Sequence, residues 1–276
     1  MTSDNPTRTI DRRAFTGAVT VASRALILRD RLLRRVKRLP PAGKLGPGIS
    51  RQVIASGQQK IDTVYVEPPN TPARAAVLIC HGIGETVDHW QGAQSLLASC
   101  AVASLVFDYA GFGRSTGIAD WRQCEGDAVA AFGLLKDLAP GLPVSLLGFS
   151  LGSGVAGAIL NRVAPECLIL CSSFTSFGAA AHTLGVPRIL SFMTPSIWNT
   201  VDSVRECALP VLILHCEQDR LFPVQMAADL ASSCGARARL VLVPEHQHNE
   251  PFYRPQPRYW NHVVEMALAG CEQRTG

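Results

Sequence analysis

The chain has 276 residues, of which 47% are hydrophobic and only 17% charged, with a net charge of +4 at pH 7. This length and composition can bury one substantial core, so we expect one principal domain. No stretch approaches 18 uncharged apolar residues, so we expect no membrane-spanning helix.

The charge is concentrated in the first 50 residues, which carry 11 Lys and Arg against 3 Asp and Glu. The other 226 residues have a net charge of −4. Residues 11–38 are amphipathic, with apolar side chains on one side of a helical wheel and most arginines on the other. Pro40-Pro41 and Gly43 then end the predicted helix and begin a linker.

Three interpretations of this leader stay open. Its apolar face packs on the rest of the chain, or it lies on an anionic membrane surface, for which a basic polar face is the expected signature. Alternatively it is a targeting signal, because Arg12-Arg13-Ala14-Phe15 is similar to a twin-arginine motif. Against the signal, Arg24 and Asp30 interrupt the apolar region.

Near-continuous runs of Val, Ile and Leu are typical of parallel strands that are covered on both faces. Such runs occur at 75–80, 102–107, 144–149, 167–171, 211–216 and 240–243. Helical stretches lie among them at about 90–99, 121–137, 152–164, 223–233 and 258–270. The alternation predicts an α/β fold with a mostly parallel sheet and helices on both of its faces.

The segment Gly148-Phe149-Ser150-Leu151-Gly152 follows one of these strands and opens a helix of small residues. This is the context of a nucleophile elbow, in which a strained turn raises a serine hydroxyl above the sheet edge. The flanking glycines let the strand and the helix pass close together. The pattern favours Ser150 as a catalytic nucleophile over a plain structural turn.

Asp219 and His248 each follow the end of a later predicted strand. The order along the chain, serine then acid then histidine, is that of the catalytic triad in one large class of hydrolases. A serine hydroxyl needs an imidazole to take its proton, and a carboxylate must orient that imidazole. We predict His248 as the base, whereas His246 comes sooner after the strand and is expected only to shape the loop.

Two further motifs are a His81-Gly82-Ile83-Gly84 loop after the strand at 75–80 and an Asp-Tyr-x-Gly-x-Gly-x-Ser-x-Gly segment at 108–117. With these motifs the chain resembles the α/β-hydrolase superfamily. It is similar in particular to small esterases, thioesterases and lysophospholipases of the Bem46 and ABHD types. The resemblance covers about residues 50–270. It implies an α/β-hydrolase fold with a sheet of about eight strands and a small lid at about 174–204.

The resemblance also implies an oxyanion hole formed by the backbone N–H groups of Ile83 and Leu151. His81 is then expected to order its loop rather than act as base, and Asp108 to anchor the glycine loop that follows it. Two positions depart from the family pattern. Cys216 stands where glycine is usual, and His248 does not follow a glycine.

These observations predict a serine hydrolase that cleaves carboxylic esters, with acyl thioesters or lysophospholipids as further substrates. A serine peptidase or amidase, and a non-catalytic or acyltransfer protein on the same scaffold, stay open as alternatives. The cysteines show no paired spacing and the histidines no ligand pattern, so we expect no metal and no cofactor. We expect no nucleic-acid partner, and a cytoplasmic protein that is peripheral on the membrane if its leader binds there.

The expected organisation has two parts. Residues 1–45 form the basic amphipathic helix and linker, and residues 46–276 form the hydrolase domain. The lid at about 174–204 is short and apolar, which favours acyl chains over sugars or highly charged substrates. A helix that packs back on the sheet would explain most of the same apolar residues.

Overall fold

The computed structural model describes residues 46–189 and 194–272 of the chain. The strands are β1 (Ile49–Ser56), β2 (Gln59–Val66), β3 (Ala75–Cys80), β4 (Val102–Phe107), β5 (Val144–Phe149), β6 (Leu168–Cys171), β7 (Val211–Cys216) and β8 (Ala238–Val243). The helices are η1 (Val87–Trp90), α2 (Gln91–Ser99), α3 (Trp121–Leu138), α4 (Leu151–Ile159), α5 (Phe177–Thr183), α6 (Thr200–Glu206), α7 (Val224–Cys234), η3 (Gly235–Arg237), α8 (Glu250–Tyr253) and α9 (Pro257–Glu272).

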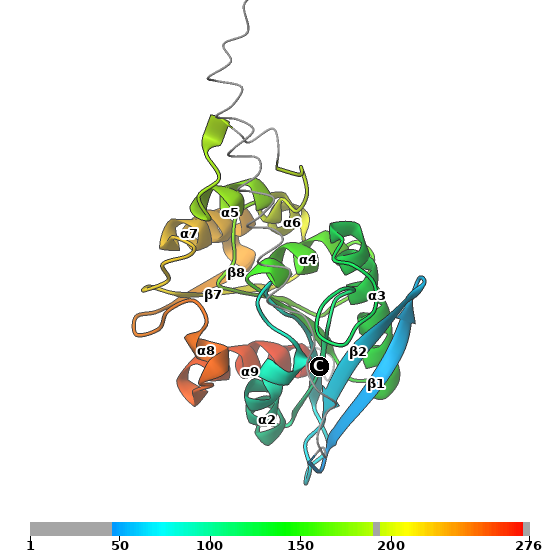
Figure 1. The fold of residues 1–276 in the computed structure, drawn as a ribbon. Coiled ribbons are helices and arrows are strands. Elements are labelled where there is room, and N and C mark those ends of the chain that lie inside the picture. Colours follow the sequence, from blue (N-terminus) through cyan, green and yellow to red (C-terminus); the bar gives the residue numbers. More distant parts are fainter. Residues whose placement is uncertain (1–45, 190–193, 273–276) are drawn as a thin grey trace, which may run out of the picture.

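The eight strands form one twisted sheet in the order β1-β2-β4-β3-β5-β6-β7-β8 (Figure 1). Strands β1 and β2 are antiparallel to each other, and β2 is antiparallel to β4. From β4 to β8 every neighbouring pair is parallel. The predicted α/β-hydrolase fold, with a mostly parallel sheet of eight strands, is therefore confirmed.

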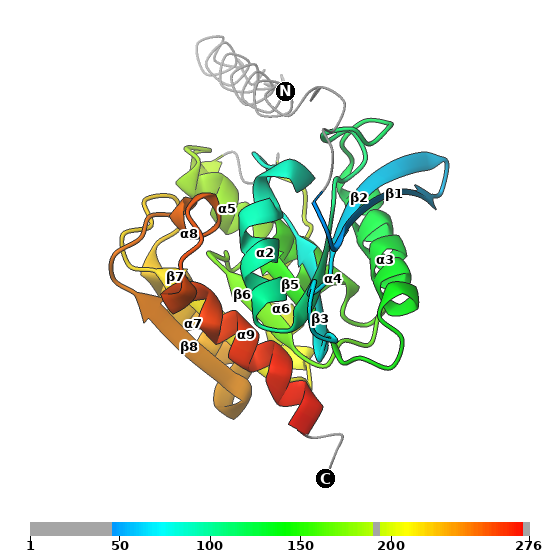
Figure 2. The same ribbon diagram turned by 90° about the horizontal axis from the view of Figure 1, so that it is seen from below.

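Helices cover both faces of the sheet. In Figure 1, α3, α4, α6 and α7 lie on one side of the strands and α2, α8 and α9 on the other, and Figure 2 shows α2 and α9 crossing the second face. Each side has its own layer of buried apolar side chains. Strands β3, β4, β5, β6 and β7 are buried along their whole length. Continuous apolar runs are what this double coverage requires.

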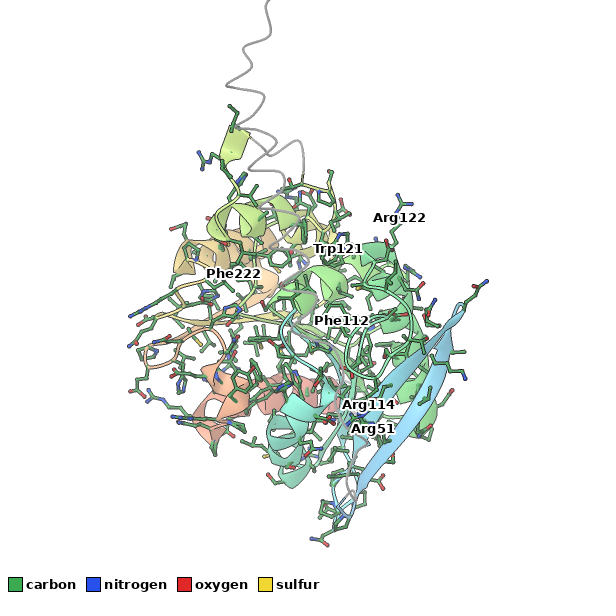
Figure 3. All side chains as sticks on the ribbon, viewed as in Figure 1. Arg51, Phe112, Arg114, Trp121, Arg122 and Phe222 are labelled. Atoms are coloured by element: carbon green, nitrogen blue, oxygen red, sulfur yellow. The ribbon has the colours of Figure 1, made fainter. Side chains whose placement is uncertain are left out.

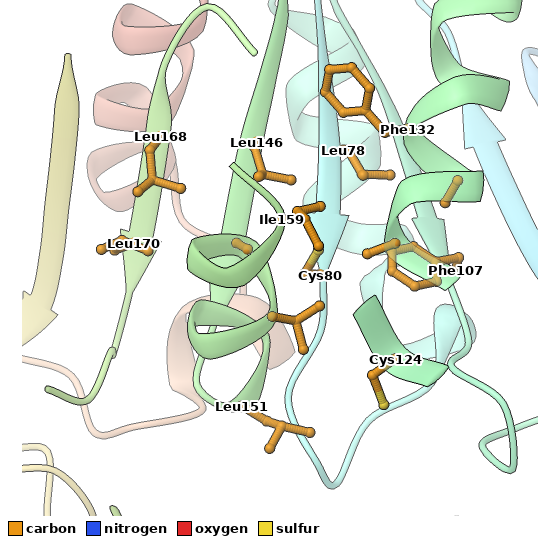
Figure 4. Close-up of a cluster of buried hydrophobic side chains, with 14 of the residues drawn as sticks. Leu78, Cys80, Phe107, Cys124, Phe132, Leu146, Leu151, Ile159, Leu168 and Leu170 are labelled. Carbon is orange, nitrogen blue, oxygen red and sulfur yellow. The ribbon is translucent and has the colours of Figure 1, made fainter. Parts of the chain in front are cut away.

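The layer under α3 and α4 sets the position of α4 on the sheet (Figure 4). Ile159 and Leu151 of α4 belong to the same buried cluster as leucines from three strands, namely Leu78, Leu146, Leu168 and Leu170. Phe132 of α3 completes the cluster beside them. Because this packing fixes the first turn of α4, it also fixes Ser150, the residue immediately before the helix.

Sequence analysis does not predict the β1–β2 hairpin or the helices between β6 and β7. The hairpin turns at Gly57, which has a φ of 57°, and pairs Ile54 with Ile61. Of the expected lid, α5 lies at its start, whereas α6 packs against α4 and α7 as part of the body. Residues 190–193 and the predicted leader at 1–45 lie outside the described residues. Among the helices that are described, none is long and apolar enough to cross a membrane.

Candidate active site

Ser150 lies in the turn between β5 and α4, in a backbone conformation that residues with a side chain rarely adopt. Its φ is 51° and its ψ is −118°. The backbone N–H of Ser150 donates to the carbonyl of Cys171 at the end of β6, at 3.0 Å. This hydrogen bond ties the turn to the neighbouring strand. A strained, over-determined turn of this kind is typical of functional sites.

The two glycines that flank the turn are required by close backbone contacts. A Cβ atom on Gly148 would lie 2.5 Å from the carbonyl oxygen of Gly152. One on Gly152 would lie 1.9 Å from the carbonyl oxygen of Cys80 at the end of β3. No side chain fits at either position, so the spacing of glycines about Ser150 follows from how closely α4 approaches β3 and β5.

The structure brings Ser150, His248 and Asp219 into one chain of hydrogen bonds. The Nδ1 atom of His248 lies 2.6 Å from Oδ2 of Asp219, and its Nε2 atom lies 2.9 Å from Oγ of Ser150. An ionised carboxylate only accepts hydrogen bonds, so Nδ1 carries the proton. The Nε2 atom is then free to accept the proton of the serine hydroxyl. Three residues that are far apart in the sequence thus meet at one edge of the sheet.

Asp219 is held in its ionised form by donors on two sides. Its Oδ1 atom accepts the backbone N–H groups of Leu221 and Phe222 at 2.8 and 2.9 Å. Burial alone would raise the pKa of Asp219, but the hydrogen bond and charge of His248 and these two N–H groups together lower it below the ordinary value. The carboxylate therefore stays charged under ordinary conditions and keeps the imidazole in one tautomer.

The imidazole of His248 is fixed by packing as well as by hydrogen bonds. The rings of Phe149 and Phe222 contact it, with centroid separations of 5.3 and 5.2 Å. The backbone carbonyl of His248 accepts a hydrogen bond from the hydroxyl of Ser172 at 3.4 Å. His246 points elsewhere, with its Nδ1 atom 3.8 Å from Oε2 of Glu250. Of the two histidines, the structure places His248 against the serine.

The loop after β3 contains a backbone N–H group without a hydrogen-bond acceptor in the described part of the chain. Gly82 donates its N–H to Oε2 of the buried Glu85 at 2.5 Å. The N–H of Ile83 has no acceptor within the described part of the chain. Leu151 is the first residue of α4, and the first N–H groups of a helix have no intrahelical partner. Ile83 and Leu151, the two donors expected from sequence, are thus available for a ligand.

His81 and Asp108 lie beneath this loop and are completely buried. The Nδ1 atom of His81 lies 2.7 Å from the carbonyl oxygen of Gly82, and burial lowers the pKa of His81 to about 4. Asp108 accepts the N–H groups of Val87 and Arg114 at 2.9 and 3.3 Å. Neither side chain has a hydrogen bond with Ser150, and both hold loops, as the sequence predicts.

An ion-pair network reinforces these loops from the outside. Arg51 of β1 donates to Asp62 of β2 at 2.8 Å and to Asp88 of η1 at 3.0 Å. Arg114, in the loop after β4, donates to the second oxygen of Asp88 at 2.8 Å. Figure 3 shows the two arginines close together beside β2. The network clamps the edge hairpin, η1 and the loop after β4 to one another.

Three aromatic side chains pack together between α3, α5 and the segment before α6. Trp121 contacts Phe177 and Trp198, with ring centroids 5.2 and 5.5 Å apart, and Phe177 lies 5.7 Å from Trp198. In Figure 3, Trp121 and Phe222 lie on the same side of the strands. The indole N–H of Trp198 donates to Glu125 of α3 at 3.0 Å, which ties the segment before α6 to the body.

A polar cavity of about 400 Å³ lies on another side of His248. Residues of the loop after β8 and of α8 form its lining, which comprises Gln247, His248, Asn249, Glu250, Tyr253 and Arg254. The cavity beside His248 is therefore lined mainly by polar and charged side chains.

Sequence analysis missed three residues that support the predicted ones. They are Ser172, whose hydroxyl holds the loop of His248; Glu85, which holds Gly82; and His215, whose Nε2 atom lies 3.7 Å from Oδ2 of Asp219. Ser172 and His215 are buried polar residues at or just after strand ends at the same edge as Ser150. That placement, in otherwise apolar runs, is the signal that could have identified them.

Residues 71–201 match the family model described as Serine aminopeptidase, S33. The chain is 29% identical over 191 residues to the lysophosphatidylserine lipase ABHD12 of Macaca fascicularis, a match that covers 62% of this chain and 48% of the lipase. The chain thus spans about half the length of the lipases it matches. It is also 29% identical over 239 residues to an uncharacterized protein of Mycobacterium tuberculosis, covering 79% and 81% of the two chains.

Two solved structures are similar to this one at low sequence identity. The esterase Pf2001 of Pyrococcus furiosus has a TM-score of 0.66 at 18% identity, with 87% of this chain and 98% of the esterase covered. Est1E of Butyrivibrio proteoclasticus, solved with ferulic acid bound, has a TM-score of 0.64 at 20% identity, with 81% and 99% covered. Together with the sheet order, these likenesses show that the chain has the α/β-hydrolase fold.

Proposed function

We propose that this protein is a serine hydrolase that cleaves carboxylic esters, with Ser150 as nucleophile, His248 as base and Asp219 as the orienting acid. The observation that carries the proposal is the hydrogen-bond chain from Ser150 through His248 to Asp219, at 2.9 and 2.6 Å. A serine with a purely structural role would need no contact with a carboxylate-bound imidazole. This arrangement generates a nucleophile at neutral pH.

In the proposed reaction, the oxygen of Ser150 attacks the acyl carbon while its proton passes to Nε2 of His248. The N–H groups of Ile83 and Leu151 stabilise the oxyanion that forms. His248 then gives its proton to the leaving alcohol, and an acyl-enzyme remains. Water attacks this intermediate with His248 again as base, which releases the acid and restores the serine.

We place the acyl group of the substrate on the side of the aromatic cluster of Trp121, Phe177 and Trp198. Two of the similar proteins are named for ester cleavage, namely the lysophosphatidylserine lipase of macaque and the Pyrococcus esterase, which agrees with an ester substrate. We therefore place carboxylic esters first and thioesters and lysophospholipids next. The aminopeptidase description of the matching family model keeps amide cleavage as a second candidate, because the same triad performs it.

The chain outside this site is assigned by proposal as well. We keep residues 1–45 as a basic helix and linker, 46–276 as the hydrolase domain, and about 174–204 as its lid. The contacts of α6 with α4 and α7 make its residues the fixed base of that lid. Of the three roles left open for residues 11–38, contact with an anionic membrane surface is the one that we test below. A leader of this kind would bring a cytoplasmic enzyme to its lipid substrate.

The proposal is tested by labelling with a fluorophosphonate probe and by assaying p-nitrophenyl esters beside aminoacyl amides of matched size. We expect labelling and ester turnover in the natural protein and neither in Ser150→Ala, which removes one hydroxyl and no core contact. Ester turnover in that variant close to the natural rate would remove Ser150 from its role. Amide turnover that exceeds ester turnover would favour the peptidase, and an unlabelled natural protein would favour a non-catalytic scaffold.

A further inference from the structure

The polar cavity beside His248 contains two opposite charges that do not neutralise each other. Glu250 and Arg254 both line it and stand four residues apart at the two ends of α8. Glutamate four residues before arginine is the favourable order for an ion pair on a helix. Among the described residues, however, no ion pair joins these two side chains.

The two charged groups differ in what already holds them. The side chain of Arg254 has no hydrogen-bond or ion-pair partner within the described chain, and only its backbone N–H is bonded, to Glu250. The Oε2 atom of Glu250 accepts the N–H of Gln247 at 2.8 Å and lies 3.8 Å from Nδ1 of His246. The carboxylate is thus turned back toward the loop after β8, away from the arginine. The cavity presents a cation and an anion at separate places.

This cavity is in the position of the leaving-group site if the proposed reaction is correct. The leaving oxygen takes its proton from Nε2 of His248, so the leaving group must start within hydrogen-bond reach of that atom. His248 itself lines the cavity. None of the aromatic residues Trp121, Phe177 and Trp198 lines it, so the acyl position proposed above and this cavity are separate.

We propose that the cavity binds a zwitterionic leaving group, with a phosphodiester on Arg254 and an ammonium group near Glu250. The planar guanidinium matches a phosphate with two parallel hydrogen bonds. A purely anionic group would be attracted by Arg254 and repelled by Glu250, and a neutral alcohol would leave Arg254 without a partner. The substrate class is a lysophospholipid with an amino-alcohol headgroup. This inference rests on the proposed function and extends it to the alcohol side of the ester.

The test compares three substrates that carry the same octanoyl chain, used as monomers: a lysophosphatidylethanolamine, a lysophosphatidylglycerol and a monoacylglycerol. We expect the natural protein to have the highest kcat/KM on the ethanolamine substrate. In Arg254→Gln, the ratio of kcat/KM for the ethanolamine substrate over the monoacylglycerol should fall about tenfold, because a charge-assisted hydrogen bond is lost. In Glu250→Gln, which keeps an acceptor for Gln247, the ratio of the ethanolamine over the glycerol phospholipid should fall about threefold.

Arg258→Gln is the matched control, because it removes the same charge from a neighbouring residue outside the cavity lining. Arg258 pairs with Glu245 at 3.4 Å, and both are exposed. We expect this variant to keep the natural ratios. If Arg254→Gln and Arg258→Gln change them equally, the effect is one of overall charge and the inference is wrong. If Arg254→Gln keeps the natural ratios, the inference is wrong as well.

Two further measurements separate this inference from the proposed function. The first is an assay of p-nitrophenyl butyrate beside the three octanoyl substrates. If the protein hydrolyses p-nitrophenyl butyrate but has equal kcat/KM on the three octanoyl substrates, the headgroup site is wrong and the proposed esterase activity stands. Binding of glycerophosphoethanolamine to Ser150→Ala, followed by NMR titration, needs no turnover. If glycerophosphoethanolamine binds Ser150→Ala and binds more weakly when Arg254→Gln is added to that variant, the result supports the site even if no ester is cleaved. No detectable binding to Ser150→Ala overturns the site.

Discussion

The Nε2 atom of His215 lies 3.7 Å from Oδ2 of Asp219, so the carboxylate proposed to orient His248 has a second imidazole beside it. The same Nε2 atom lies 3.0 Å from the carbonyl oxygen of Phe222, to which it donates. Burial lowers the pKa of His215, so this ring stays neutral. His215 thereby fixes the turn whose N–H groups hold Asp219 in place.

Replacing His215 should weaken this turn and misplace the carboxylate. In His215→Leu the carbonyl of Phe222 loses its donor, which should lower the free energy of unfolding by about 1–3 kcal/mol. We expect kcat to fall more than KM changes, because the turn orients Asp219 and does not touch substrate. His215→Gln supplies an amide donor and should recover part of both losses. Chemical denaturation measures the loss of stability, and ester kinetics measure the loss of kcat. If His215→Leu and His215→Gln lose equal amounts of both, His215 does not fix the turn through its hydrogen bond to Phe222.

The two histidines of the loop after β8 should differ sharply in their effect on turnover. His248→Ala removes the only imidazole in contact with Ser150 and should lower kcat by about three orders of magnitude or more, since triad members act as a unit. His246→Ala removes a side chain that faces Glu250 and should cost about tenfold at most. Steady-state kinetics on a p-nitrophenyl ester decide the matter, and a reversed order of effects would assign the base to His246.

A methyl group on Gly152 should be far more damaging than one on an open glycine. In Gly152→Ala the new Cβ would meet the backbone carbonyl of Cys80 at 1.9 Å, so β3 or α4 must move. We expect a loss of about 3 kcal/mol or more in unfolding free energy. Gly133→Ala, on an exposed face of α3 with nothing within 4 Å, should instead gain about 0.5–1 kcal/mol. Urea denaturation of both variants measures these changes.

Stability should depend on pH through the buried Glu85. Burial raises its pKa to about 8, so the folded protein keeps a proton that the unfolded chain releases above its ordinary pKa of 4.5. The contribution of Glu85 to the free energy of unfolding therefore falls as pH rises between about 5 and 8. Asp108, whose pKa burial raises to about 7, acts in the same direction.

Glu85→Gln keeps the acceptor for the N–H of Gly82 and removes the ionisation. The difference in unfolding free energy between this variant and the natural protein should therefore grow with pH by up to about 1.4 kcal/mol per unit over that range. Urea titrations at several pH values measure it. A difference that does not change with pH would show that Glu85 is already ionised in the folded protein.

Deleting residues 1–40 separates membrane contact from folding. If the leader contacts lipid, short-ester hydrolysis should stay near its natural rate, while binding to anionic vesicles should fall. The binding that is lost should be salt-sensitive, because each basic residue near such a surface contributes about 1 kcal/mol. Vesicle sedimentation measures it, and aggregation or unfolding of the shortened protein would show instead that the leader packs on the body.

The parallel core could be predicted from the sequence because strands covered on both faces have uninterrupted apolar runs. This holds for 75–80, 102–107 and 144–149, whose predicted bounds are those of β3, β4 and β5. The β1–β2 hairpin escaped prediction because β1 is only partly buried and mixes polar with apolar residues. Edge strands need no continuous apolar run, so composition alone does not distinguish them from loops.

The site was predictable where one local pattern identifies a residue and not where distant segments meet. Ser150 is marked by its flanking glycines and by the strand and helix on either side. The contact of Ser172 with His248, by contrast, joins residues 76 positions apart through one hydroxyl and one carbonyl. No local spacing encodes such a contact, because it depends on how β6 and the loop after β8 end at the same sheet edge.

The positive φ of Ser150 means that folding and the proposed catalytic role make opposing demands on this position. A conformation of this kind costs on the order of 1 kcal/mol or more for a residue with a Cβ, and glycine adopts it without that cost. Folding stability alone would therefore favour glycine at position 150. Serine is there at the expense of stability, and a variant selected only for heat resistance would gain by giving up the proposed nucleophile.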